Sequence, residues 1–384
     1  MMNVEEYHSY DDIVELINSN SKYKYVSFVY TPWHLHSAIA FLNSEECKVN
    51  PTDGLFVIMH NPRGGYLIPT EYLDKSGISF VFLRICSKNR KYEPFIFGKF
   101  LFNRNKIQEK DFYILSPGLY YYALASKLSI ARLNEHRIIC VAIDEGIGTY
   151  INNSNAYVEL MSLGFGKKIL TTLKIELEEK IIKKALKRKG QILDYFLFKK
   201  INDKIIENSR RFSNYAYAFS DFGFKLNVQT DEYNSSHYVI ICTAQDDGIY
   251  GNFDIANKKI IGECIKLFKE KGYDVLIKKH PRDDSNVNYE GAVILRNSKY
   301  SMETILSRLE RKPDYIIGYD STVLVTAKLL FGINTISLLD MLLEITTYSE
   351  VQKKTVDGFK SVFGEYFMIP SDFGKMRDVV KNED

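Results

Sequence analysis

Short apolar runs alternate with amphipathic segments along most of the chain, which is the pattern of strands that alternate with helices. In the first half the predicted strands are residues 25–30, 55–59, 79–83, 112–115 and 138–143. Thr31 and Pro32 follow the first strand and suit the N-cap and first position of a helix, which continues through 38–42. Strands that alternate with helices predict a parallel sheet and the α/β fold class.

The same alternation resumes in the second half of the chain. The predicted strands there are 238–243, 274–277, 315–317 and 335–338, and the predicted helices are 258–271, 302–308 and 323–330. We therefore expect two Rossmann-like domains that face each other across a cleft, with ligands at the carboxyl ends of their strands. The first is residues 1–215, with a Lys-rich helical insert at 167–211, and the second is residues 216–384 with a C-terminal tail.

Composition narrows the class of protein. The chain has 384 residues, of which 45% are hydrophobic and 26% charged, so it is long enough for two globular cores. A net charge of +3 is too small to indicate a nucleic-acid partner. Five scattered cysteines favour reduced core residues over a disulfide framework, and so a cytoplasmic location.

Targeting signals are not visible in the sequence. The chain begins with a polar, acidic segment, and no run reaches the roughly 20 apolar residues of a membrane span. The basic segment 167–211 has two interpretations: a solvated bridge between domains, or a face that contacts anionic lipid. The second would place the protein peripherally on the inner face of the cytoplasmic membrane.

An acidic motif follows the predicted strand 138–143. Asp144 and Glu145 lie at the strand end and are followed by Gly146, which permits a tight turn. Neighbouring carboxylates raise one another's pKa, and a carboxylate at a cleft can then accept a proton from a sugar hydroxyl. The alternative is an acidic turn without a chemical role.

Two further motifs suit an anionic ligand. Lys279, His280 and Pro281 follow the strand 274–277, where an imidazole among basic side chains can donate to a phosphate. Ser321 and Thr322 precede the helix 323–330, where hydroxyls and unpaired backbone N–H groups form an anion site. The alternative for His280 is a histidine with only a structural role, and the alternative for Ser321 is a simple N-cap.

The motifs, taken in this order, resemble the bacterial sialyltransferases of the lipooligosaccharide type and the related capsule polysialyltransferases. The matching segments are TPWHLHSAIAFLN, DEGIGTY, IKKHPRDD, SMETIL and GYDSTVLVTAKLLFG. The resemblance implies the two-domain GT-B fold and an inverting transfer of sialic acid from CMP-sialic acid to a cell-surface glycan. It implies neither a cofactor nor a metal, and the sequence lacks an Asp-x-Asp triplet for a metal-bound sugar nucleotide.

The resemblance also assigns roles on the donor side. His280 is expected to act as general acid at the CMP phosphate, and Glu303 to lie near the ribose unless it is an exposed helical carboxylate. The remaining donor-binding residues are expected to be Lys279, Pro281, Ser321 and Thr322.

The general base is less well defined by the motifs. We rank Asp144 first and Glu145 second, because the acidic motif is the more distinctive, and Asp246 third, because some members are thought to use an aspartate at the start of the second domain. The acceptor side is expected to include Thr31, His34 and Gly146.

Other functions fit the same scaffold. One is transfer from a different nucleotide sugar, and another is a non-catalytic glycan-binding or assembly protein. The expected partners are a nucleotide sugar and a glycan acceptor. No motif specifies the acceptor, the linkage, the number of residues added or the oligomeric state.

Overall fold

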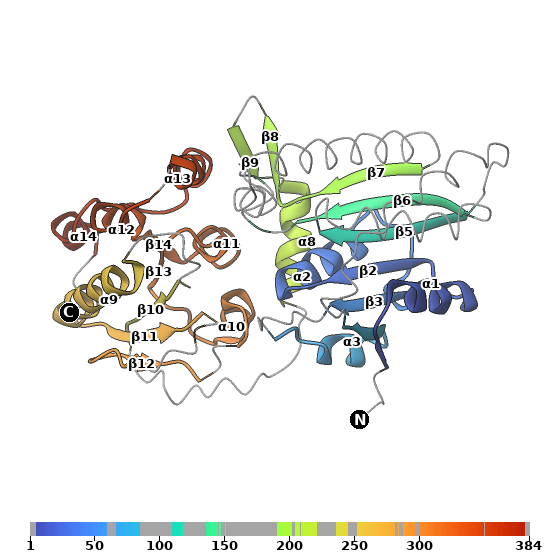
Figure 1. The fold of residues 1–384 in the computed structure, drawn as a ribbon, viewed down its shortest axis with the longest axis horizontal. Helices are drawn as coiled ribbons and strands as arrows, with labels where there is room; N and C mark the ends of the chain where they lie inside the picture. Colours follow the sequence, from blue (N-terminus) through green and yellow to red (C-terminus); the bar gives the residue numbers. More distant parts are fainter. Residues whose placement is uncertain are drawn as a thin grey trace, which may run out of the picture.

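The computed structural model describes residues 5–59, 67–84, 110–117, 136–144, 146, 150, 190–201, 204–207, 209–220, 236–244, 252–280, 283, 287–296, 299–348 and 350–380. Two parallel sheets, each flanked by helices, lie beside one another (Figure 1). The predicted α/β fold class is therefore confirmed.

The first sheet is built from the N-terminal half of the chain. Its strands run in the order β1-β4-β3-β2-β5-β6-β7, and every neighbouring pair is parallel. Counted from β2, the order is the 3-2-1-4-5-6 of a Rossmann fold, with β1 added at one edge. The strands are β1 (Glu6–Tyr7), β2 (Tyr25–Val29), β3 (Gly54–Met59), β4 (Ser79–Leu83), β5 (Lys110–Pro117), β6 (His136–Ile143) and β7 (Gly190–Tyr195).

The helices described with this sheet include the predicted one after the first strand. They are α1 (Tyr10–Ser19), α2 (Pro32–Leu42), α3 (Glu71–Lys75), α8 (Ser209–Ser220) and a 3-10 turn at Pro51–Asp53. Thr31 caps α2 and Pro32 is its first residue, as predicted. The expected boundary between residues 215 and 216 falls within α8, which packs against α2.

The second sheet has the order β12-β11-β10-β13-β14, again wholly parallel. Counted from β10 this is 3-2-1-4-5, so the two sheets share one topology. Its strands are β10 (Tyr238–Cys242), β11 (Asp274–Lys278), β12 (Val293–Ile294), β13 (Tyr315–Gly318) and β14 (Asn334–Ser337). Its helices are α9 (Phe253–Glu270), α10 (Met302–Arg308), α11 (Thr322–Phe331), α12 (Leu339–Ile345), α13 (Glu350–Phe363) and α14 (Phe373–Val379).

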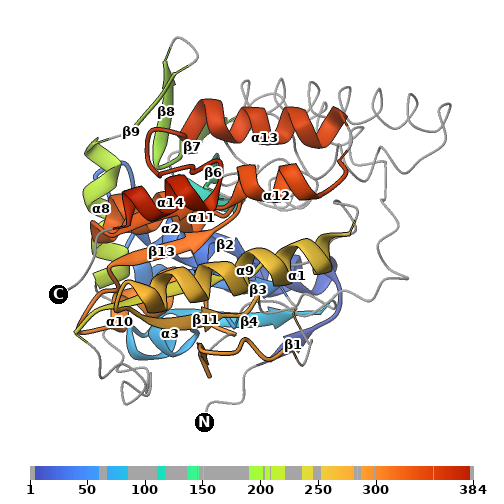
Figure 2. The same ribbon diagram turned by 90° about the vertical axis from the view of Figure 1, so that its left-hand side faces the viewer.

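Helices cover the second sheet, and α9 packs against both α12 and α14 (Figure 2). Because both faces are covered, the strands are continuous apolar runs: all of β13 is buried, and so is β10 up to its last residue. Each Rossmann-like order reverses at one point, between β2 and β5 in the first sheet and between β10 and β13 in the second. Ligands bind at such points, beyond the carboxyl ends of the strands.

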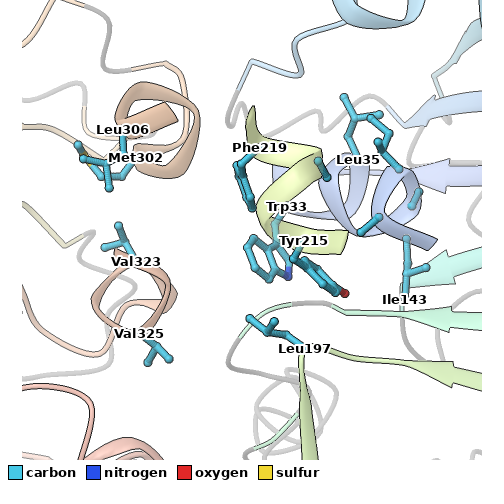
Figure 3. Packing of buried hydrophobic residues seen from close by; sticks show 14 of the residues in the cluster. Trp33, Leu35, Ile143, Leu197, Tyr215, Phe219, Met302, Leu306, Val323 and Val325 are labelled. Atoms are coloured by element: carbon cyan, nitrogen blue, oxygen red, sulfur yellow. The ribbon is translucent and has the colours of Figure 1, made fainter. Parts of the chain in front are cut away.

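The two domains share an apolar contact centred on α8 and the start of α2. Phe219 of α8 lies 6.0 Å from Phe331 of α11, measured between ring centroids. Figure 3 shows apolar side chains of the two domains that belong to one buried cluster. They are Trp33, Tyr215 and Phe219 on one side, and Met302, Leu306, Val323 and Val325 on the other.

The prediction of helix over 167–211 is wrong for its C-terminal part. Residues 190–195 form β7, and an antiparallel hairpin follows in β8 (Phe198–Ile201) and β9 (Lys204–Glu207). The reason is tertiary pairing, because β7 aligns with β6 along its whole length and completes the sheet. Residues 167–189 lie outside the described residues.

Among the helices that the structure describes, none is both long and apolar enough to span a bilayer.

Candidate active site

A pocket opens at the carboxyl ends of β10, β11 and β13, opposite the N-terminus of α2. This is the reversal point of the second sheet, where a ligand is expected. The predicted site residues that line it are Lys279, His280, Glu303, Ser321 and Thr322, with Thr31 from the first domain. Four separate segments of the sequence therefore meet at one cavity. Pro281 lies outside the described residues.

His280 is held at the end of β11 by its backbone. Its N–H donates to the hydroxyl oxygen of Thr243, at 3.1 Å, and Thr243 follows β10. This bond joins the ends of two adjacent strands, so the backbone that carries the imidazole is fixed to the centre of the sheet. The His280 side chain is half-buried at the pocket wall.

Lys278, the last residue of β11, lies deeper in the same wall. Its side chain is buried, and its Nζ donates to the carbonyl oxygen of Lys279 at 3.0 Å. Burial lowers the pKa of Lys278 to about 8, although the nearby Cys242 and Glu303 act in the opposite direction. The pocket therefore contains an ammonium that loses its charge in the mildly alkaline range.

Glu303 lies in the first turn of α10 and is buried rather than exposed. Its Oε1 accepts a hydrogen bond of 2.9 Å from the hydroxyl of Thr326 in α11. Burial raises the pKa of Glu303, and the Thr326 hydroxyl partly offsets this effect. The alternative interpretation, an exposed helical carboxylate, is wrong.

Ser321 and Thr322 stand at the start of α11. Ser321 is its N-cap, with its Oγ accepting from the N–H of Val323 at 3.4 Å, and both residues also line the pocket. The cap and an anion site are compatible, because the capping residue and the positive end of the helix dipole both lie at the pocket wall.

Asp144 follows β6 directly and is fully buried. Its Oδ1 accepts from the N–H of Gly146 at 2.6 Å, and its Oδ2 accepts from the N–H of Leu197 at 3.0 Å and from the Tyr150 hydroxyl. Burial raises the pKa of Asp144, while these hydrogen bonds lower it. The carboxylate is therefore held in one orientation by three donors.

The acidic motif also touches the second domain. Gly146 has a φ of +95°, and a Cβ at this position would lie 2.8 Å from the Oγ1 of Thr322. A small cavity beside this contact is lined by Asp144, Trp33 and Thr322, and the last two also line the larger pocket. Asp144 thus adjoins the pocket without lining it. Glu145 and Asp246 lie outside the described residues.

On the acceptor side, Thr31 lines the pocket and His34 lies behind it. The N–H of His34 donates to the Thr31 Oγ1, and the His34 Nδ1 accepts from the N–H of Tyr30, both at 3.3 Å. Burial lowers the pKa of His34 to about 3, so the imidazole is neutral at physiological pH. His34 therefore fixes the start of α2.

Two further residues of the site were not singled out by the sequence. Trp33, the chain's one tryptophan, lines both cavities, and its place in the first turn of the helix that follows a predicted strand was the available signal. The Tyr150 hydroxyl donates to Asp144, and the one feature of the sequence that pointed to Tyr150 was its place in the DEGIGTY segment. Within the described part of the chain, no group of three or more His, Cys, Asp or Glu side chains could hold a metal ion.

Two Rossmann-like domains that meet at this pocket define a GT-B fold. The sequence model of the alpha-2,8-polysialyltransferase (POLYST) family matches residues 26–340, which span both sheets. The chain belongs to this family, and it is therefore a glycosyltransferase of the sialyltransferase class. The resemblance seen in the motifs is confirmed.

Several solved structures are similar to the chain. One is an alpha/beta-galactoside alpha-2,3-sialyltransferase from Photobacterium phosphoreum, with 15% identity, a TM-score of 0.46, and coverage of 90% of this chain and 97% of that chain. Another is a sialyltransferase from Photobacterium damsela, with 11% identity, a TM-score of 0.46, and coverage of 90% and 81%. A putative UDP-N-acetylglucosamine 2-epimerase from Listeria monocytogenes has 9% identity, a TM-score of 0.43, and coverage of 94% and 92%. No curated protein matches the chain in sequence.

Proposed function

We propose that the protein transfers sialic acid from CMP-sialic acid to a hydroxyl of a cell-surface glycan, such as lipooligosaccharide or capsule, with inversion and without a metal. The observation that carries this proposal is the convergence of His280, Glu303 and the start of α11 on one pocket. Family membership supports sialic acid as the transferred group. We place this activity in the cytoplasm, with peripheral membrane contact through the basic segment.

The donor phosphate binds at the start of α11. A helix of ten residues carries a partial positive charge at its N-terminus, which favours an anion. Ser321 and Thr322 add two hydroxyls, and His280 and Lys278 stand at the opposite wall. The buried Glu303 accepts hydrogen bonds from the ribose hydroxyls.

The reaction is a single displacement at the anomeric carbon of sialic acid. The acceptor oxygen forms a bond to this carbon while the bond to the phosphate oxygen breaks, and the electron pair leaves with CMP. One displacement inverts the configuration. His280 and the α11 N-terminus stabilise the charge that develops on the phosphate, which is the role a metal serves in other transferases.

The proton of the acceptor hydroxyl passes to a carboxylate. We keep Asp144 first, since its pKa is raised and its cavity adjoins the donor pocket, then Glu145 and then Asp246. A raised pKa brings a carboxylate closer to the range in which a general base is efficient. Thr31 and Gly146 contribute to the acceptor side of the cleft.

Calorimetry with CMP tests the donor site. We expect His280→Ala and the double change Ser321→Ala/Thr322→Ala each to weaken binding at least tenfold, which corresponds to about 1.4 kcal/mol. Ser9→Ala is the matched control. Ser9 caps α1, which is also ten residues long and lies far from the pocket. This change removes a similar helix cap and should leave CMP affinity unchanged. Unaltered CMP binding in both pocket variants would show that the site is elsewhere.

A further inference from the structure

Tyr150 joins three parts of the molecule. Its hydroxyl donates to the carboxylate of Asp144 and accepts from the N–H of Phe198 at 3.1 Å. Its ring is in T-shaped contact with Phe363, the last residue of α13, at 5.9 Å between centroids. One side chain thus links the acidic motif, the hairpin β8–β9 and the C-terminal part of the chain.

The contact with α13 is an aromatic cluster rather than a single pair. Phe198 lies 5.1 Å from Tyr150, 5.5 Å from Phe363 and 5.8 Å from Tyr366, measured between centroids. Phe363 is buried, with 1% of its surface exposed. Because α13 cannot leave β8 without exposing these rings to water, the cluster holds the C-terminal helix against the first domain.

The same loop touches the second domain at another point. Thr322 of α11 packs against Gly146, so both described ends of the segment that follows Asp144 meet residues from the C-terminal half. The Tyr150 hydroxyl donates to the Asp144 carboxylate beside the backbone N–H groups of Gly146 and Leu197. Because Phe363 packs on the Tyr150 ring, its contact bears on the position of this side-chain donor.

We propose that Tyr150 is a positioning residue of the active site: its hydroxyl holds the Asp144 carboxylate, and its ring, packed against Phe363, ties that carboxylate to the second domain. This rests on the proposed function, in which the acidic motif supplies the base. The motif is then placed by contacts that both domains make with it. In this role Tyr150 acts through Asp144 rather than on the substrate.

A double-mutant cycle measures this coupling. Tyr150→Phe keeps the ring and removes the hydroxyl, and Phe363→Leu keeps an apolar side chain and removes the ring contact. A small displacement of a reacting group costs about 10- to 100-fold in rate, so each change should lower kcat at least tenfold while CMP affinity changes less than about twofold. In the Tyr150→Phe background, Phe363→Leu should have little further effect, because its route to Asp144 is already broken.

Phe359→Leu is the matched control. Phe359 lies on the same helix and is equally buried at 1% exposure. Its ring stacks on Phe367 at 4.9 Å and is tilted against Phe363 at 6.0 Å, and none of the ring contacts of the described residues joins it to Tyr150. It should retain kcat even if it lowers the melting temperature as much as Phe363→Leu does. Multiplicative losses in the double variant, or an equal loss of kcat in Phe359→Leu, would overturn the proposal.

Two readouts separate positioning from a general structural defect. The Tyr150 hydroxyl lowers the pKa of Asp144, so Tyr150→Phe should move the acidic limb of the kcat profile to higher pH. The single tryptophan, Trp33, lines the small cavity together with Asp144, Tyr150 and Phe363, so its emission in the protein without nucleotide reports how these side chains are placed. This emission should be the same in the wild type and in Phe359→Leu, and should be shifted in Phe363→Leu.

The emission readout also distinguishes the proposal from the proposed function. If the wild type binds CMP but transfers no sialic acid, the proposed function fails, and the emission still decides the coupling. An identical emission of Trp33 in the wild type and in Phe363→Leu, both without nucleotide, would overturn the coupling itself.

Discussion

Lys278 should make nucleotide binding depend on pH in a range where CMP itself does not titrate. The second pKa of a phosphate monoester is about 6, so CMP remains a dianion above pH 7. Lys278 has a pKa of about 8 because it is buried in the pocket wall. Its ammonium is therefore charged below about pH 8 and neutral above it.

The magnitude follows from this pKa. The charged fraction of Lys278 falls from about nine tenths at pH 7 to about one tenth at pH 9. If the charged form is the one that binds the phosphate, the affinity for CMP should fall about tenfold over these two pH units, equivalent to about 1.4 kcal/mol. The loss should be centred near pH 8.

Calorimetry at pH 7, 8 and 9 and constant ionic strength measures the effect. Lys278→Met keeps most of the length of the side chain without its charge and should bind CMP more weakly at pH 7, with little further change up to pH 9. Lys279→Met alters the next residue of the same strand end and should keep the pH dependence of the wild type. If the affinity of the wild type for CMP stays constant from pH 7 to 9, or if Lys278→Met retains the tenfold loss, the charge of Lys278 does not control CMP binding.

Three other predictions concern the base, the fold and the metal. Asp144→Asn should lower kcat by about 10²- to 10⁴-fold with CMP affinity nearly intact, Glu145→Gln should be second, and Asp246→Asn should have the least effect; steady-state kinetics would reverse this ranking if Asp246→Asn alone abolished transfer. Burial lowers the pKa of His36 from 6.5 to about 3, so the unfolded chain takes up a proton below pH 6.5 that the folded chain does not. The free energy of unfolding should thus lose about 2 kcal/mol between pH 7 and 5 through this side chain, and His36→Gln, followed by urea denaturation, should remove that part of the loss. Transfer should persist in excess EDTA, and activity that is lost in EDTA and restored by manganese or magnesium would contradict the metal-free mechanism.

Local sequence signals predicted most of the fold because the conformational preferences of these segments agree with the helices and strands that they form. Thr31 and Pro32 mark the start of α2 by their own conformational preferences, and continuous apolar runs mark strands buried on both faces. The predicted helix at 302–308 has these bounds in the structure. The failure at 190–207 has a non-local cause, since β7 is a strand by virtue of its pairing with β6.

Some residues of the candidate site could likewise be brought together from the sequence, and others could not. His280, Ser321 and Thr322 could be brought together from the sequence because all three follow predicted strands of one parallel sheet, whose carboxyl ends share an edge. The contact between Tyr150 and Phe363 could not, because it joins residues from opposite halves of the chain through side-chain packing alone. The burial of Glu303 likewise depends on the packing of α11 against α10, and the local sequence does not predict this packing.

The central claim is that this chain moves sialic acid from CMP-sialic acid. The direct measurement is incubation of the protein with CMP-sialic acid and a panel of glycan acceptors that includes lactosides, with the products read by mass spectrometry. We expect an acceptor that gains the mass of one or more sialic acid residues, with stoichiometric release of CMP, and loss of this product in His280→Ala. Transfer from a different nucleotide sugar with none from CMP-sialic acid, or an undiminished product in His280→Ala, would contradict the central claim.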